Sequence, residues 1–455
     1  MTHETQYAKT ADGLYIAYQV VGSGPIDLAM DFHAFTGNVD LIWQEPDWGP
    51  ILVGLTEFAR LIIHDRRGSG ASSRNVPPPN LETRAADLLL VLDVVGSAAP
   101  VLGAAASTGA MHALFAATNP DRTSGLTWNY PRARLAWAPD YPWGQGSEAF
   151  EAAVVHAEKS GTTEQARELA LSRAAQRAGV PDEERHGLAV DEELVRRYAR
   201  VTRNTVSPDV AEAVTRISWQ TDVRDILPSV HTPTALIIGD ADAKAELAEA
   251  EYVASLMPNA KLHVLSGRSG LQEDAIKDIV GELAGIDRPR HPTTVLAAVL
   301  FTDIVDSSRR QAAVGDRAWK ELVLAHHSAV RECLGRWEGT EHDTAGDGFF
   351  ASFVGPARAI HCAHEIADRI ATLGIETRAG VHIGECEVID GKPGGLAVTI
   401  GARVLATAGA REVVVSQTVK DLVAGSGFSF TDRGEQQLKG VPDRWRLYTA
   451  APPTT

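Results

Sequence analysis

The sequence has little cysteine and no long apolar run. Only Cys333, Cys362 and Cys386 occur among the 455 residues, and they lie far apart in the chain. Such cysteines form neither a disulfide framework nor a paired metal site, which is typical of proteins from a reducing compartment. No segment approaches the ~18–20 apolar residues of a membrane span, and the polar start "MTHETQYAKTADG" lacks the apolar core of a signal peptide. We therefore expect a cytoplasmic protein without a membrane span.

Positive charge is also scarce. Lys and Arg number 43 against 59 Asp and Glu, which gives a net charge of −16. This excess of negative charge repels phosphate backbones and argues against a general nucleic-acid-binding protein. A nucleotide site would therefore need its own local cations or metal ions. The length indicates two or three domains, and 44% hydrophobic residues is ordinary for a globular protein.

Residues 1–285 have the pattern of an α/β domain. Short apolar segments alternate with helical stretches such as "TRAADLLLVLDVVG" (83–96), which predicts a mostly parallel sheet covered on both faces. Between about 146 and 225, charged amphipathic helices follow one another without a strand, which indicates a helical cap inserted over the sheet. The predicted strands are 14–21, 26–32, 59–65, 99–106, 234–240 and 261–267.

A second domain follows a short linker. The linker, residues 286–293, is polar and contains Pro289 and Pro292. Over residues 294–455, strands and helices alternate in a pattern that predicts a compact α+β domain. The predicted elements are a strand at 295–302, a helix at 308–335, a strand pair at 340–353, a helix at 356–373, strands at 377–389, a helix at 398–409 and strands near 413 and 445.

Two aspartates of the second domain stand beside apolar strands. Asp303 ends the run in "AAVLFTDIVDSS", and Asp347 lies between Gly346 and Gly348 in "TAGDGFFASF". Each alone has an ordinary explanation, namely a strand that leads into a helix cap and a hairpin turn. An acid at a strand end beside an acid at a hairpin tip can also bind two divalent ions. Mg²⁺ prefers few carboxylates together with phosphate oxygens and water, so such a pair fits a triphosphate site.

Five segments of the second domain occur in the order and spacing of a known family. They are "LFTDIVDSS", "TAGDGFFASF", "RAGVHIGE", "GGLAVTIGARVLA" and "LKGVPDRWRLY". Together they resemble the catalytic domain of class III nucleotidyl cyclases, in its mycobacterial-like soluble form, over residues 294–450. The resemblance implies a ferredoxin-like core and the conversion of ATP to 3′,5′-cyclic AMP and pyrophosphate. It also implies two Mg²⁺ or Mn²⁺ ions in each active site.

The resemblance assigns roles to individual positions. Asp303 and Asp347 match the metal-binding aspartates, and the carbonyl of Ile304 matches a backbone metal ligand. Arg403 matches the arginine that stabilises the transition-state phosphate. Lys439 matches the lysine that holds the terminal phosphates.

Thr399 stands where the family usually has an asparagine that orients the ribose and the α-phosphate. Thr399 and Arg403 are four residues apart, so one helix face presents both. The family builds its active site between two catalytic domains, one of which supplies the metal acids and the other the arginine. The resemblance therefore implies that the working enzyme is a homodimer.

The positions that read the base differ from the adenylyl cyclase pattern. Asp343 stands where adenylyl cyclases have a lysine, and Lys392 stands near the position of its aspartate partner. The two charges are exchanged, and the pair can form a salt bridge. Asp343 and Lys392 can satisfy either adenine or guanine, because both bases offer donors and acceptors along one edge. A guanylyl or broad-specificity cyclase therefore remains the alternative to an adenylyl cyclase.

The first domain resembles the α/β-hydrolase fold. The resemblance rests on "HDRRGSGASS" (64–73) and "VLGAAASTGAMHALFAATNPDR" (101–122). That family presents its nucleophile in a G-x-S-x-G elbow. One alignment puts Ala106 at the nucleophile position, and a shift by one residue puts Ser107 there. The expected acid is Asp240 or its neighbour in "GDADAK", Asp242.

The hydrolase histidine is missing from its expected position. Gly270 or its neighbours occupy it, and His263 lies within the last predicted strand. Without a general base, attack by serine is slower by orders of magnitude. We expect an inactive pseudo-hydrolase domain with a regulatory role. The alternative is an esterase that the cyclase-like domain regulates.

A pocket under the cap can still bind a small apolar ligand. A cluster of aromatic residues in "TWNYPRARLAWAPDYPW" either lines this pocket or packs as a core under the cap. The cluster consists of Trp128, Trp137, Trp143, Tyr130 and Tyr141.

Overall fold

The computed structural model describes residues 3–32, 37–45, 48–178, 182–240, 244–265, 273–285, 294–389 and 392–453. The chain forms two compact units, Met1–Arg290 and His291–Thr455. The predicted linker, 286–293, lies outside the described residues. Within the described ranges no helix is both long enough and apolar enough to cross a bilayer.

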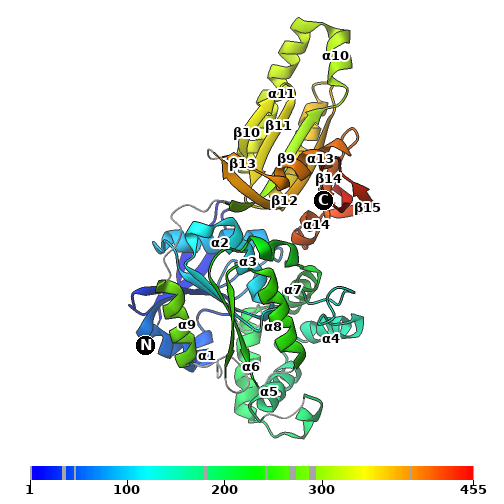
Figure 1. Cartoon of the computed structure of the whole chain (residues 1–455). Coiled ribbons are helices and arrows are strands. Elements are labelled where there is room, and N and C mark those ends of the chain that lie inside the picture. The colour runs from blue at the N-terminus through cyan, green and yellow to red at the C-terminus, as the bar shows by residue number, and fades with distance from the viewer. Residues whose placement is uncertain are drawn as a thin grey trace. The chain divides into compact units, whose positions relative to one another are not determined.

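An eight-stranded sheet forms the centre of the N-terminal unit (Figure 1). The β1–β2 and β2–β4 pairs are antiparallel, and every other pair of neighbours is parallel. This is the mostly parallel sheet that the sequence predicts. The strand order is β1 (Gln6–Lys9), β2 (Tyr15–Val21), β4 (Ala59–His64), β3 (Ile26–Met30), β5 (Val101–Ala105), β6 (Gly125–Asn129), β7 (Thr234–Gly239) and β8 (Ala260–Leu265).

Helices cover both faces of this sheet. They are α1 (Trp48–Phe58), α2 (Leu81–Val94), α3 (Gly109–Thr118), α8 (Lys244–Leu256) and α9 (Glu273–Gly285). A Cβ atom at Gly125 of β6 would lie 2.6 Å from Leu283 of α9, so α9 covers the face to which Gly125 points. Trp128 points to the opposite face, because side chains alternate along a strand, and its indole packs on Gly109 of α3.

The helical cap lies between β6 and β7 in the chain. Its helices are α4 (Ser147–Glu158), α5 (Thr163–Ala178), α6 (Glu192–Thr205) and α7 (Pro208–Gln220). α4 packs against α7, and α5 packs against α6. α6 begins after Asp191, whose carboxylate accepts the N–H of Glu193, and it buries Val195 and Tyr198 on one face. The cap is thus a small helical layer with apolar contacts of its own.

The C-terminal unit has a strand–helix–strand–strand–helix–strand core (Figure 1). The core elements are β9 (Thr294–Ile304), α11 (Asp316–Arg336), β10 (Thr340–Ala345), β11 (Gly348–Phe353), α12 (Pro356–Ala371) and β12 (Thr377–Ile389). The four strands lie in the order β12-β9-β11-β10, which is the ferredoxin-like arrangement that the sequence predicts. Beyond β12 the sheet continues with β14 (Val413–Ser416), β16 (Arg444–Ala451) and β15 (Ser429–Gln437).

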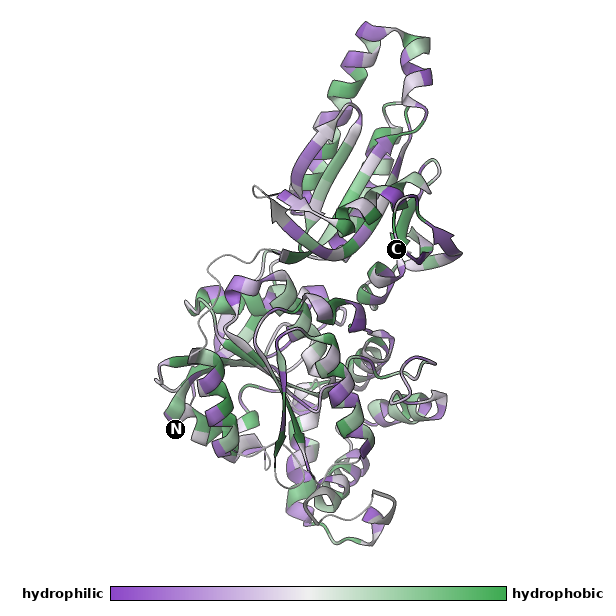
Figure 2. Ribbon diagram, viewed as in Figure 1, coloured by the Kyte–Doolittle hydropathy of each residue, from purple (hydrophilic) through white to green (hydrophobic). Residues whose placement is uncertain are grey.

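Two features of this unit differ from the sequence pattern. The helix predicted over 308–335 is divided into α10 (Ser307–Val314) and α11, because Gly315 adopts a φ of 80° between them. The polar strand β15 was not predicted, since its side chains are mostly exposed and show no apolar alternation. Figure 2 shows it as hydrophilic, in contrast to the hydrophobic inner strands. Pairing with β16 holds it in the sheet.

We predict that Gly109→Ala destabilises the N-terminal unit. The new Cβ would lie 2.0 Å from the Trp128 ring, and overpacking of this kind costs roughly 1–3 kcal/mol of unfolding free energy. The measurement is the urea midpoint of the full chain by tryptophan fluorescence. Gly187→Ala is the control, because no atom lies within 4 Å of its added Cβ. Equal midpoints for the two variants would contradict the proposed packing.

Candidate active site

Asp303 and Asp347 lie close together at one end of the C-terminal sheet. Asp303 is the penultimate residue of β9, and Asp347 occupies the two-residue loop between β10 and β11. β11 pairs with β9 in a register that sets Phe349 opposite Thr302, which brings the loop beside the strand end. Gly346 has a φ of 66°, which suits the tight turn.

The raised pKa of Asp347 indicates that its carboxyl group lies close to that of Asp303. Burial and the negative charge of Asp303 raise the pKa of Asp347 above its usual range. The Oδ2 atom of Asp347 is buried, and the described part of the chain gives it no hydrogen-bond partner. Two carboxylates within reach of each other, one of them with an unsatisfied oxygen, form a site that favours a cation.

Arg378 is the only described cation that pairs with this acidic pair. It lies on β12 directly opposite Asp303, and its Nη2 donates to Asp303 Oδ2 at 2.9 Å. One guanidinium cannot balance two carboxylates, so a negative charge remains when both are ionised. The sequence pattern did not single out Arg378, although it begins the motif "RAGVHIGE". Its contact with Asp303 follows from strand register rather than from spacing along the chain.

The donor set fits Mg²⁺ or Mn²⁺. Carboxylate oxygens are the ligands that these ions prefer, and the side chain of Ile304 is buried, so only its main chain is available to a ligand. No group of three or more His, Cys, Asp or Glu side chains suited to a metal occurs within the described ranges. Ions held by Asp303 and Asp347 would thus leave coordination positions for phosphate oxygens and water.

Thr399, Arg403 and Lys439 gather at a second place in the unit. Thr399 and Arg403 lie on α13 (Leu396–Ala406), and the Thr399 hydroxyl donates to the Gly395 carbonyl at 3.3 Å. The Nε of Arg403 donates to the main-chain carbonyl of Lys439 at 2.9 Å. Arg403 and Lys439 are both exposed, and among the described residues neither forms an ion pair with an acid. Both cations therefore remain available to an anionic ligand.

Asp343 and Lys392 do not form the expected salt bridge, although the structure describes both residues. Asp343 lies on β10 next to an irregularity in its pairing with β11, and its Oδ1 accepts the N–H of Thr344. Lys392 lies on β13 (Lys392–Gly394), which pairs with the far end of β12. Burial and the charge of Lys392 lower the pKa of His342, so Lys392 lies near His342.

The elbow of the N-terminal unit places its strained residue at Ala106. Ala106 has a left-handed φ of 48° where β5 turns into α3, whereas Ser107 does not. An elbow presents its nucleophile at that strained position, so Ala106 occupies it and Ser107 follows. The Trp128 indole donates to the Ala106 carbonyl at 2.7 Å and braces the turn.

The remaining hydrolase positions do not complete a triad. Asp240 is exposed at the end of β7. Asp242 and Gly270 lie outside the described residues. His263 lies within β8, as the sequence predicts. No described contact connects Asp240 or His263 to the elbow.

Two of the five residues in the aromatic cluster belong to the core. Trp128 and Tyr141 are fully buried, and the Tyr141 hydroxyl donates to Glu249 at 2.5 Å. Trp137 is 54% exposed, so it does not line an enclosed pocket. The cavity beside Ser107 is lined instead by arginines, namely Arg84, Arg132 and Arg134, and by small apolar side chains. This mixed lining differs from what the predicted small apolar ligand would require.

Comparison with known proteins assigns both units. Residues 291–450 match the family model of the adenylate and guanylate cyclase catalytic domain. The chain is 28% identical over 167 residues to "Putative adenylate cyclase 3" of Rhizobium meliloti, a match that covers 34% of this chain and 28% of that protein. The matched region therefore spans less than a third of this relative's length.

The N-terminal unit has different relatives. Over 265 residues the chain is 26% identical to "Putative carbamate hydrolase RutD" of Caulobacter sp., covering 56% of this chain and 88% of that protein. A bromoperoxidase structure from Bacillus anthracis is similar at 20% identity and a TM-score of 0.48, covering 62% of this chain and 98% of that chain. Residues 291–450 therefore belong to the catalytic domain family of adenylate and guanylate cyclases, and they follow a unit whose mostly parallel sheet is covered by helices on both faces.

Proposed function

We propose that the C-terminal unit converts a nucleoside triphosphate, in the first place ATP, to the 3′,5′-cyclic nucleotide and pyrophosphate. The observation that carries this proposal is the proximity of Asp303 and Asp347, which is close enough for one charge to raise the pKa of the other carboxyl. A pair of acids at this place fits the cation requirement of a triphosphate site. The name of the rhizobial relative favours ATP.

Asp303, Asp347 and the carbonyl of Ile304 would hold two Mg²⁺ or Mn²⁺ ions in this proposal. Such ions, when bound, lower the pKa of a ribose 3′-hydroxyl and neutralise phosphate charge. Arg378 has a separate part, because its ion pair with Asp303 fixes the direction of that carboxylate before any ligand arrives. The chain thus presents one constrained acid and one unsatisfied acid.

The other proposed site residues act on the substrate. In the reaction the 3′-oxygen forms a bond to the α-phosphorus, the bond from that phosphorus to the β-phosphate oxygen breaks, and the hydroxyl proton passes to solvent. The guanidinium of Arg403 is exposed and keeps free donors to stabilise the charge that develops at the α-phosphate. Lys439 would hold the leaving pyrophosphate, and Thr399 would position the ribose. The hydrogen bond between Arg403 and the Lys439 main chain holds the two cations at one place.

We further propose that two copies of the chain form each active site, with the aspartates from one copy and Arg403 from the other. Within one chain the described contacts group Asp303 with Asp347 and Arg378, and group Arg403 with Lys439. Among the described residues, no hydrogen bond or ion pair connects the two groups. Two separate half-sites are what a shared site between copies requires.

The N-terminal unit does not act as a hydrolase in this proposal. Alanine occupies the strained elbow position and offers no oxygen for attack. An ester-hydrolysis assay with the full chain and with Ser107→Ala separates this reading from the esterase alternative. Equal background rates are expected from both proteins.

We predict that the purified full chain with Mn²⁺ forms cyclic AMP from ATP and that Asp303→Ala lowers the rate at least ~100-fold, because metal ions supply several kcal/mol of transition-state stabilisation. The measurement is product formation from each of ATP, GTP, CTP and UTP. Asp368→Ala is the control, since Asp368 is exposed on α12 and pairs with Arg411. Full activity in Asp303→Ala would refute the mechanism, whereas faster turnover of GTP would replace adenine by guanine as the preferred base.

We predict that mixing two inactive variants restores activity. In an equimolar mixture of Asp303→Ala and Arg403→Ala chains, half of the dimers are mixed and one of their two sites is intact, so about a quarter of the wild-type rate is expected. The measurement is cyclic AMP formation after the two proteins are mixed and incubated. A mixture as inactive as its components would show that each chain builds its own site.

We predict that Mn²⁺ stabilises the protein more at about pH 8 than at about pH 5.5. Since the pKa of Asp347 is raised, this carboxyl takes up a proton at a higher pH than an ordinary aspartate. The ion must displace that proton, so its apparent affinity falls as the pH is lowered through the raised pKa. The measurement is the Mn²⁺-dependent increase in melting temperature at both pH values. Asp347→Asn should lose most of this increase, and an equal increase at both pH values would contradict the prediction.

A further inference from the structure

Neighbouring cavities of the N-terminal unit share lining residues, and one of them lies beside the elbow. The innermost is a slot of about 20 Å³ beside Ser107, lined by Arg84, Arg132 and Arg134. A second slot of the same size shares Arg84 with it. The second slot shares Val210 with an outer cavity of about 490 Å³. Since a water molecule needs roughly 10–15 Å³ of such space, the inner slot admits only a small group.

Positive charge is buried beside the innermost slot. Arg66 and Arg84 share one carboxylate, that of Asp31, at 3.0 and 2.6 Å. Asp31 is almost completely buried, and the charges of the two arginines outweigh the effect of burial and lower its pKa. Burial lowers the pKa of His112 to about 3, so this neighbouring imidazole is neutral and adds no charge. Two guanidiniums thus share a single carboxylate next to the slot.

Arg84 shows that this charge is incompletely satisfied. Its Nε is buried and has no hydrogen-bond partner among the described residues, and its side chain is 11% exposed. Burial and the charge of Arg66 lower the pKa of Arg84 to about 10. An uncompensated buried cation is costly unless an anion joins it.

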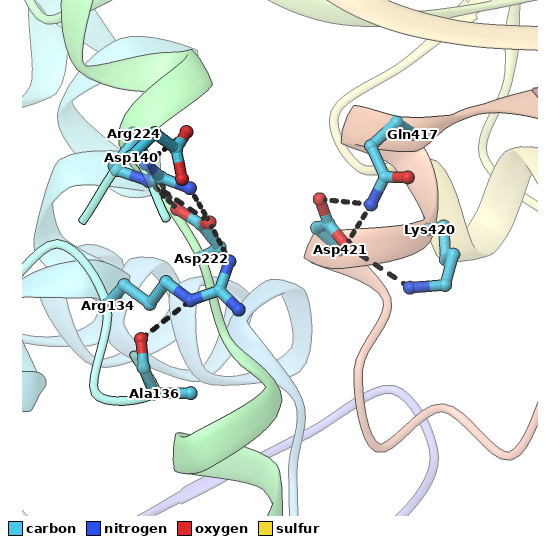
Figure 3. A network of polar contacts seen from close by, with 8 residues as sticks. All are labelled: Arg134, Ala136, Asp140, Asp222, Arg224, Gln417, Lys420 and Asp421. Carbon is cyan, nitrogen blue, oxygen red and sulfur yellow. Dashed lines mark hydrogen bonds and ion pairs between the residues drawn. The ribbon is translucent and has the colours of Figure 1, made fainter. Parts of the chain in front are cut away.

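Arg132 and Arg134 approach the slot from the segment that leads to the cap. Arg134 is held in place, because its Nη1 lies 2.8 Å from Asp222 and its Nε donates to the Ala136 carbonyl (Figure 3). Arg132 has weaker partners, Glu246 at 3.7 Å and Glu249 at 3.9 Å, which are longer than hydrogen bonds. Glu249 already accepts the Tyr141 hydroxyl. Arg132 is therefore the guanidinium most available to a ligand.

We propose that this cavity binds a small organic carboxylate with a short apolar tail, and that it binds the compound without cleaving it. The planar fork of an arginine matches the two oxygens of a carboxylate. The narrow slot accepts that planar group better than a tetrahedral phosphate. The slot of about 20 Å³ has room for the carboxylate group alone, so the tail would extend along Val210, which lines both the second slot and the cavity of about 490 Å³. Because Ala106 occupies the elbow, the bound compound meets no nucleophile there.

The test titrates the full chain with hexanoate by calorimetry and repeats the titration with hexanamide and with inorganic phosphate. Hexanoate should bind saturably, whereas hexanamide, which has the same tail but no charge, should bind at least ~tenfold more weakly, as expected for hydrogen bonds to charged groups. Binding of hexanamide as tight as that of hexanoate would overturn the proposal. So would binding of phosphate without binding of hexanoate, or no binding of hexanoate.

Variants locate the site. Arg132→Gln should weaken hexanoate binding about tenfold, and Arg84→Gln should weaken it further if the protein folds. Ser107→Leu places a larger side chain in the slot and replaces none of its arginines, so it should abolish binding even where Arg84→Gln fails to fold. Arg216→Gln is the matched control, because Arg216 lies on α7 next to Ile217 but is exposed and paired with Glu212. Unchanged affinity in both Arg132→Gln and Ser107→Leu would refute the assignment.

Discussion

The repulsion between Asp303 and Asp347 is the constraint on which the C-terminal site depends. The fold brings two carboxylates together and provides one guanidinium, from Arg378, to balance them. Strand pairing holds the two carboxylates together against this repulsion, because the pairing of β9 with β11 and β12 fixes both acids before any ligand is present. A chain selected for stability alone would relieve this repulsion with one amide. Retaining it leaves a demand for positive charge at the place where a triphosphate and its cations fit.

The N-terminal unit contains the reverse arrangement at one place. There two arginines, Arg66 and Arg84, share the single carboxylate of Asp31. In both units the sheet supplies rigidity and the charged residues stand at strand ends or on the helix that covers them. The acidic pair has the sign of the net charge of −16, whereas the arginines around Asp31 have the opposite sign. Net charge describes how the whole molecule meets a polyanion, whereas a site depends on charges within a few ångströms.

Features that depend on short stretches of sequence could be predicted, and features that depend on register could not. Most inner strands of the first unit are predicted by their apolar runs, but the buried inner strand β6 is not among the predicted strands. The glycines that flank Asp347 predict its hairpin. The edge strands β1 and β15 are polar, and only their pairing with a neighbour makes them strands. Arg378 contacts Asp303 across two strands that are far apart in the chain, so no spacing rule reveals it.

The place of Arg84 on a buried helix face could have been predicted from the sequence. It lies four residues before Leu88 and seven before Val91, and both are buried on the apolar face of α2. An arginine on such a face needs a buried partner, but the sequence does not say which acid provides it. The salt bridge between Asp343 and Lys392 was considered for a similar reason. The sequence shows that the two charges are opposite, but it does not show where β10 and β13 place the two residues.

The elbow keeps its strained backbone although it has no nucleophile at Ala106. A left-handed alanine costs on the order of 1–3 kcal/mol, and an enzyme accepts such strain in order to present a nucleophile. Ala106 presents none, yet the strain persists because the surroundings impose it. The Trp128 indole holds the Ala106 carbonyl, Thr108 binds the N–H and the carbonyl of Ala105, and Gly109 admits the indole against α3. These contacts depend on the fold of the turn. They do not depend on a catalytic residue, so they remain when the nucleophile is replaced by alanine. The turn also shapes one wall of the arginine-lined slot, so a binding role preserves it where a hydrolytic role does not.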